Sequence, residues 1–326
     1  MNSIAITSIP NIRIGQVEDE AAGTGVTVIV APKGATASID VRGGGPASRD
    51  TRILDPLAAA ERINAIVLGG GSAYGLDAAG GVMRALRERG MGLTVMPDVV
   101  VPLVCQSDIF DLGVGRADVF PSPEMGYAAC NAAFEGTAGN YRDGNYGAGC
   151  GASVGKLAGQ HLAMKSGIGS AAVRVGDLYL GALVVVNACG DIYDSSTGTK
   201  IAGTRTDASY QELMYAALEQ EKTEDTQTPC KVAMATNTSI GAIITNAAFT
   251  KAQLCKLAGM AHDAYARAIR PVHTSMDGDS IFGVSVGDVE ASLDVVGTLA
   301  ADLMEQAILR ACYSADSAYG LPSAKR

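Results

Sequence analysis

The alternation of apolar and polar residues predicts short strands and amphipathic helices, each grouped in pairs along the chain. The predicted strands are 24–30, 36–41, 63–68, 169–175, 178–187, 191–193, 231–236, 240–244 and 280–286. The predicted helices are 76–89, 122–134, 209–218, 250–269 and 293–312, and Thr250 with Gln253 forms a capping box at the start of the fourth. Residues 31–35 (APKGA) suit a hairpin-like connection between the first two strands. This order favours an α/β sandwich with antiparallel sheets over a doubly wound fold.

The most informative stretch is 231–246 (KVAMATNTSIGAIITN), in which Asn237, Thr238 and Ser239 separate two apolar runs. Polar side chains inside a core need hydrogen-bond partners, so their presence between two buried strands is unusual. The preceding window, 219–229, is the most charged of the chain and predicts an exposed, flexible loop. A loop that leads into a buried Asn-Thr pair suits a self-cleaving precursor, in which Thr238 attacks the Asn237 carbonyl and becomes a new N-terminus. A polar kink between two strands explains the same residues.

Two glycine-rich turns invite a nucleotide-binding interpretation, and both fail on spacing. After the strand 63–68, the dinucleotide pattern needs glycine where Tyr74 stands. In 146–156 (YGAGCGASVGK), a phosphate-binding loop would need glycine at Cys150 and Ser or Thr at Leu157. Glycines that allow close backbone packing explain both turns.

Composition narrows the class of protein further. The net charge of −9 over 326 residues, with no Lys/Arg cluster, argues against a nucleic-acid partner. The seven scattered cysteines are typical of free thiols in a reducing compartment, and the chain has no signal-like N-terminus and no 18-residue apolar run. We therefore expect a cytoplasmic protein without a membrane partner. No H-E-x-x-H motif or cysteine pair indicates a metal, and we expect no cofactor.

Four blocks, in order, resemble the DmpA-type aminopeptidases, which are N-terminal-nucleophile hydrolases. The blocks are 70–76 (GGSAYGL), 151–156 (GASVGK), 237–240 (NTSI) and 273–279 (HTSMDGD). The resemblance implies a four-layer α-β-β-α sandwich of the DmpA and ornithine acetyltransferase type. It also implies a single domain over 1–326 that cuts itself into an α chain (1–237) and a β chain (238–326), and a homo-oligomer of these processed units.

The resemblance further implies roles for individual residues. Thr238 would be the nucleophile and its freed α-amine the general base, after autocleavage of the Asn237–Thr238 bond. Asn187 matches the oxyanion-stabilising asparagine, and a turn asparagine explains it equally well. Tyr74 matches the active-site tyrosine and Lys156 a lysine near the nucleophile. A core aromatic and a surface lysine are the ordinary alternatives for these two.

Asp277 and Asp279 form an Asp-Gly-Asp turn that ordinary turn chemistry also explains. By the resemblance, one carboxylate would orient Thr238 and the pair would share protons. The two aspartates match the nylon-oligomer hydrolase branch, whereas the aminopeptidases carry Ser and Glu here. His273, just before the turn, is assigned a shaping role and no catalytic one.

The expected activity is hydrolysis of short peptide-like amides through an acyl-Thr238 intermediate, of the aminopeptidase or β-peptidyl aminopeptidase type. Three alternatives stay open: an endo-hydrolase of ω-amino acid (nylon-type) oligomers, an acyltransferase like ornithine acetyltransferase, and an unprocessed binding protein without activity.

Overall fold

The computed structural model describes residues 2–136, 139–221 and 237–325. Its strands are β1 (Asn2–Ile4), β2 (Arg13–Asp19), β3 (Thr24–Val41), β4 (Ala47–Arg49), β5 (Ile63–Gly69), β6 (Leu93–Met96), β7 (Val99–Val101), β8 (Val104–Asp108), β9 (Ser153–Val154), β10 (Met164–Lys165), β11 (Ile168–Val175), β12 (Leu178–Asn187), β13 (Asp191–Asp194), β14 (Thr199–Ala202), β15 (Thr238–Ala247), β16 (Ile269–Arg270) and β17 (Ser280–Val289). Its α-helices are α1 (Ala78–Glu88), α2 (Pro123–Ala132), α3 (Tyr210–Glu221), α4 (Lys251–Ala268) and α5 (Leu293–Tyr313).

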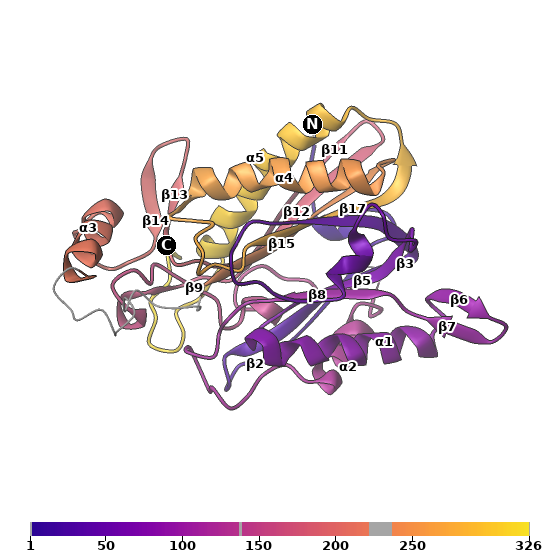
Figure 1. The fold of residues 1–326 in the computed structure, drawn as a ribbon, viewed down its shortest axis with the longest axis horizontal. Coiled ribbons are helices and arrows are strands. Elements are labelled where there is room, and N and C mark those ends of the chain that lie inside the picture. The colour runs from indigo at the N-terminus through magenta and orange to yellow at the C-terminus, as the bar shows by residue number, and fades with distance from the viewer. Residues whose placement is uncertain (1, 137–138, 222–236, 326) are drawn as a thin grey trace.

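The strands form the two middle layers of a sandwich, with α4 and α5 over one side and α1 and α2 over the other (Figure 1). Successive side chains of a strand point to opposite faces, and the core follows this rule. Val184 of β12 packs with the α4 and α5 cluster, whereas its neighbour Leu183 joins the apolar cluster between the strand layers. A third cluster packs Val28 and Val67 against Val82 of α1. The expected four-layer α-β-β-α sandwich is confirmed.

Strand β3 joins the two strand layers. The strand order is β1-β11-β12-β15-β17-β3-β5-β8-β4, with β2 also paired to β3. The first half of β3 pairs with β2 and β5, and its second half, Thr36–Val41, pairs with β17. The predicted hairpin over 31–35 is therefore wrong. β3 continues through this segment with a shift of register between Val30 and Ala35, and its two halves pair with different strands.

The pairing along this order is antiparallel except for two parallel pairs, β15–β17 and β5–β8. The capping box predicted for Thr250 and Gln253 is confirmed at the start of α4. The predicted helix 76–89 begins as a 3-10 turn over Ser72–Asp77 before α1. Residues 219–221, predicted as the start of a loop, instead extend α3. The predicted strand 231–236 lies outside the described residues.

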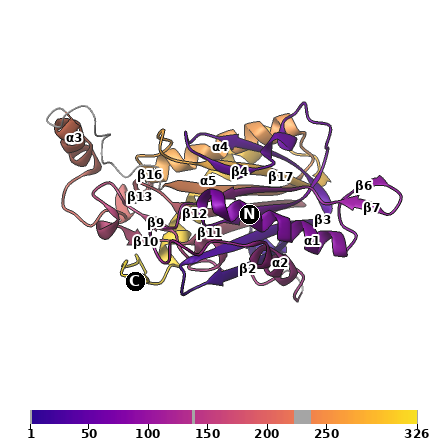
Figure 2. The same cartoon turned by 60° about the horizontal axis from the view of Figure 1, so that its bottom comes forward.

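Two features stand apart from the sandwich in Figures 1 and 2: the β6–β7 hairpin at one end and α3 at the other. The hairpin was not predicted as such, and its residues Leu93, Val95 and Met96 are exposed. Among the residues that the structure describes, none of the helices combines the length and apolar character needed to cross a membrane.

Candidate active site

Thr238 and Asn187 lie directly opposite each other on neighbouring strands. Thr238 is the first residue of β15 and Asn187 the last residue of β12, and the antiparallel register pairs the two. Both are buried, with exposed fractions of 5% and 0%. Strand pairing holds this buried polar pair together and fixes the separation of its two side chains.

The Asn237 carbonyl, which precedes Thr238, accepts two hydrogen bonds. The Thr238 hydroxyl donates to the Asn237 oxygen over 2.5 Å, and the Gly278 N–H donates to it over 3.0 Å. Gly278 has to be glycine, because a Cβ there would lie 2.7 Å from Thr238 Oγ1. The nucleophile candidate thus touches the carbonyl that it would attack, and a backbone amide faces the oxygen that would become negative.

Lys156 and Asn187 form a buried polar pair. Lys156 Nζ donates to Asn187 Oδ1 over 2.7 Å and to the Asn187 carbonyl over 3.1 Å. The Ser153 N–H also donates to Asn187 Oδ1, and Asn187 Nδ2 donates to the Phe110 carbonyl over 2.9 Å. Because three groups bond its side chain, Asn187 is held rigidly beside Thr238.

Burial changes the chemistry of Lys156. Its side chain is 2% exposed, and desolvation lowers its pKa from 10.5 to about 7. The nearby Asp277 and Asp111 oppose this shift by favouring the ammonium form. Because Lys156 is buried, the alternative that it is a surface lysine is wrong.

The two aspartates of the Asp-Gly-Asp turn point into hydrogen-bonded sites rather than into solvent. Asp277 Oδ2 accepts from the Thr274 N–H over 2.7 Å and from the Thr274 hydroxyl over 2.8 Å. Burial, followed by the negative charge of Asp279, raises the Asp277 pKa. Asp279 Oδ1 accepts from the N–H of Ser239, the residue after Thr238, over 2.7 Å. Both carboxylates thus border the start of β15.

Tyr74 stands apart from this cluster. It lies on the 3-10 turn after β5, is 63% exposed, and stacks on Phe120 with ring centroids 4.9 Å apart. The described residues show no hydrogen bond from Tyr74 to Thr238, so its role stays a prediction.

Asp111 is a further buried group at the site, and the sequence did not single it out. It accepts from the Gly71 N–H and the Thr24 hydroxyl, and burial raises its pKa to about 6. Asp111 directly follows Phe110, whose carbonyl accepts from Asn187, and it accepts from Gly71 at the start of the turn that carries Tyr74. It therefore connects that turn with the surroundings of Asn187. The signal that could have found it is a pair of acidic residues, Asp108 and Asp111, in an otherwise apolar segment.

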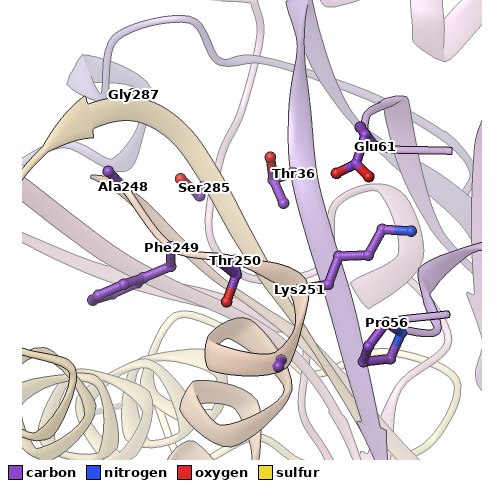
Figure 3. A pocket seen from close by; sticks show the side chains of 10 residues that line it. Thr36, Pro56, Glu61, Ala248, Phe249, Thr250, Lys251, Ser285 and Gly287 are labelled. Atoms are coloured by element: carbon purple, nitrogen blue, oxygen red, sulfur yellow. The ribbon is translucent and has the colours of Figure 1, made fainter. Parts of the chain in front are cut away.

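A cavity of about 500 Å³ lies elsewhere, at the end of β15 remote from Thr238. Figure 3 shows Lys251 and Glu61 on one side of it and Phe249 on the other. The ten residues of β15 lie between it and Thr238, which at about 3.3 Å per residue is roughly 30 Å. The cavity is therefore not part of the candidate site.

The four α-β-β-α layers are those of the N-terminal-nucleophile hydrolase fold. The L-aminopeptidase D-Ala-esterase/amidase of Ochrobactrum anthropi, whose solved structure is described as a variant of that fold, aligns with a TM-score of 0.71 at 18% identity, over 99% of this chain and 91% of that one. A Burkholderia sp. beta-aminopeptidase aligns with a TM-score of 0.63 at 20% identity, over 95% and 86%.

The chain belongs to peptidase family S58, whose model matches residues 4–325. An uncharacterized aminopeptidase of Mycobacterium leprae is 37% identical to it, over 99% of this chain and 93% of the relative. A 6-aminohexanoate-oligomer endohydrolase of Paenarthrobacter ureafaciens is 32% identical, over 93% and 84%. Membership of this family makes the protein a hydrolase of peptide or amide bonds.

Proposed function

We propose that the protein is a self-processing amidohydrolase that uses Thr238 first to cut its own chain and then to cut short peptide-like amides. The observation that carries this proposal is the contact between the Thr238 hydroxyl and the Asn237 carbonyl, inside a buried cluster of lysine, asparagine and aspartate side chains. A kink between strands has no need of such a cluster.

Self-cleavage begins when Thr238 Oγ attacks the Asn237 carbonyl carbon. The Gly278 N–H stabilises the negative oxygen of the tetrahedral intermediate. The C–N bond then breaks, the leaving nitrogen takes up the hydroxyl proton, and an ester joins Asn237 to Thr238 Oγ. Water hydrolyses this ester, which leaves the chains 1–237 and 238–326. Asp277, whose pKa burial raises, is suited to accept and return the proton.

In turnover, the freed α-amine of Thr238 is the base. An α-amine has an ordinary pKa of about 7.7–8.0, so a substantial part is neutral near pH 7 and accepts the hydroxyl proton. Thr238 Oγ then forms an ester with the acyl part of the substrate, and the amine part leaves with that proton. Water, activated by the same α-amine, releases the acid.

The other residues support these two reactions. Asn187, held by Lys156, donates to the oxyanion, and Lys156 keeps Thr238 and its amine in position. Asp279 fixes the start of β15. Tyr74 donates from the rim to the substrate or the intermediate. The names of the relatives favour two substrate classes, short peptides with a free amino end and 6-aminohexanoate oligomers.

Denaturing mass spectrometry tests the proposal. Two chains split between Asn237 and Thr238 are expected in place of one species of 33.2 kDa. A panel of aminoacyl p-nitroanilides, β-dipeptides and aminohexanoate oligomers then identifies the amide that is cut. A single inactive chain would favour the binding protein. Acetyl transfer from acetylornithine to glutamate, without hydrolysis, would favour the acyltransferase.

Asn187→Ala is expected to fold and to process at least partly, but to turn over about 10²–10³-fold more slowly, the usual effect of losing one oxyanion donor. The measurement is kcat on the substrate found in the panel. Asn246→Ala is the matched control, because Asn246 is a buried asparagine at the other end of β15, where it holds Tyr179 and Asp177. It should lose stability and keep kcat. Full kcat in Asn187→Ala would contradict the oxyanion role.

We also propose that processed units assemble into a homo-oligomer in the cytoplasm, without nucleic-acid or membrane partners. The exposed apolar residues of the β6–β7 hairpin support self-association, since an isolated two-stranded hairpin is only marginally stable in water. The unpaired cysteines of the described residues suit a reducing compartment. Sedimentation velocity of a Val95→Asp variant checks the assembly, and we expect a smaller sedimentation coefficient than that of the wild type. An unchanged coefficient would show that the hairpin is not part of the interface.

A further inference from the structure

His273 lies directly behind Asp279, and the carboxylate connects it to the start of β15. Asp279 Oδ1 accepts from the Ser239 N–H over 2.7 Å. Asp279 Oδ2 accepts from His273 twice, from its N–H over 3.2 Å and from its ring Nδ1 over 2.9 Å. The Asp279 side chain is 2% exposed. One buried carboxylate thus links a histidine to the residue that follows the nucleophile.

The bond to Asp279 assigns the donor role to ring Nδ1, because the carboxylate oxygen that faces it is the acceptor. Within the part of the chain that the structure describes, His273 Nε2 is buried without a hydrogen-bond partner. The titratable groups packed around the ring are His262, with ring centroids 4.8 Å apart, Tyr265, at 5.7 Å, and Asp279 itself.

The backbone of His273 also shows that this position is constrained. Its φ is +57°, in the left-handed region, which only a few per cent of residues other than glycine adopt and in which asparagine, aspartate and histidine are the most common of these. Such a conformation persists where the surroundings fix it. Here the Thr274 hydroxyl donates to Asp277 and closes the following turn, and the imidazole ring of His273 is bonded to Asp279.

We propose that His273 is a positioning residue that orients the Asp279 carboxylate and thereby holds the Ser239 amide and the Thr238 end of β15 in the geometry for attack. The Nδ1–H is the group that matters, since the His273 backbone N–H donates whatever the side chain is. His273 acts through Asp279 and not as a group that takes part in the reaction. This inference rests on the proposed use of Thr238 as the nucleophile.

Two variants separate the ring donor from the backbone. His273→Asn places an amide N–H close to the position of Nδ1, and His273→Gly removes the donor; both remove the ring and both accept φ +57°. His273→Asn should process and turn over within about threefold of wild type. His273→Gly should lose about tenfold in kcat and in the rate of self-cleavage, with little change in KM, as expected when one charge-assisted hydrogen bond is lost. His161→Asn, at an exposed histidine, is the control and should match wild type.

A second measurement does not depend on activity. In the Thr238→Ala background, where the chain cannot use this nucleophile, hydrogen exchange at the Ser239 amide should be about tenfold faster with His273→Gly than with His273→Asn. Equal exchange rates, or equal kcat for the two variants, would overturn the proposed role of His273. Cleavage of the wild-type chain before Thr238 would still support Thr238 as the nucleophile. An uncut, inactive wild type would instead overturn the proposed function, and the exchange rates would still decide on His273.

Discussion

Replacing Thr238 with alanine should leave one uncut chain of 33.2 kDa and abolish amide hydrolysis. The variant lacks the oxygen that attacks the Asn237 carbonyl, and without the cut no α-amine is freed to act as the base. One substitution therefore removes the nucleophile and the base together, and kcat/KM should fall by about 10⁴-fold or more. Denaturing mass spectrometry and the substrate panel measure both effects.

Two neighbouring variants serve as controls for this result. Thr238→Ser keeps the hydroxyl and should still cut itself and turn over. Ser239→Ala removes a hydroxyl that has no hydrogen-bond partner among the described residues, so it should process normally. If Thr238→Ala were cut at another bond, the nucleophile would have to be a residue other than Thr238.

Asp279→Asn is expected to have the second largest effect. Asp279 receives three N–H donors, one from Ser239 and two from His273, and an asparagine there turns an NH₂ group toward one of these donors. Since each hydrogen bond to a charged group contributes about 1.5–3 kcal/mol, the free energy of unfolding should fall by about 3 kcal/mol. Self-cleavage should slow by about 100-fold. Thermal unfolding and a time course of processing measure the two effects.

Asp277→Asn is the matched comparison. Both donors to Asp277, from Thr274, meet the same oxygen, Oδ2, so an asparagine oxygen can accept both. This variant should keep its stability and lose rate, because only the proton-accepting carboxylate is gone. If both aspartate variants behaved as wild type, ordinary turn chemistry would account for the Asp-Gly-Asp sequence.

The sequence predicted those parts of the fold that depend on local signals. The capping box of Thr250 and Gln253 starts α4, because it satisfies N–H groups within one turn. The apolar runs of β12 and β17 and the long final helix likewise follow from short-range periodicity. The course of β3 could not be predicted in this way. Pro32 and Gly34 are typical of a turn, and only the strands that pair with β3 show that it continues through them.

The same distinction holds for the candidate site. The Asn-Thr pair was visible as polar residues between apolar runs, and the family resemblance implied Asn187, Lys156 and the two aspartates. The pairing of Asn187 with Thr238 connects strands far apart in sequence, and Gly278 and Asp111 act through a backbone amide and a buried carboxylate. No spacing rule identifies such contacts, since they depend on how distant segments pack.

The strand order also determines what a cut before Thr238 would do to the molecule. β15 and β17 come after the cut, yet they lie between β12 and β3, which come before it. The two products would therefore remain interleaved, and each alone would expose strand edges that the other now covers. Scission should therefore leave migration in a native gel unchanged, and each fragment expressed alone should aggregate through its exposed strand edges.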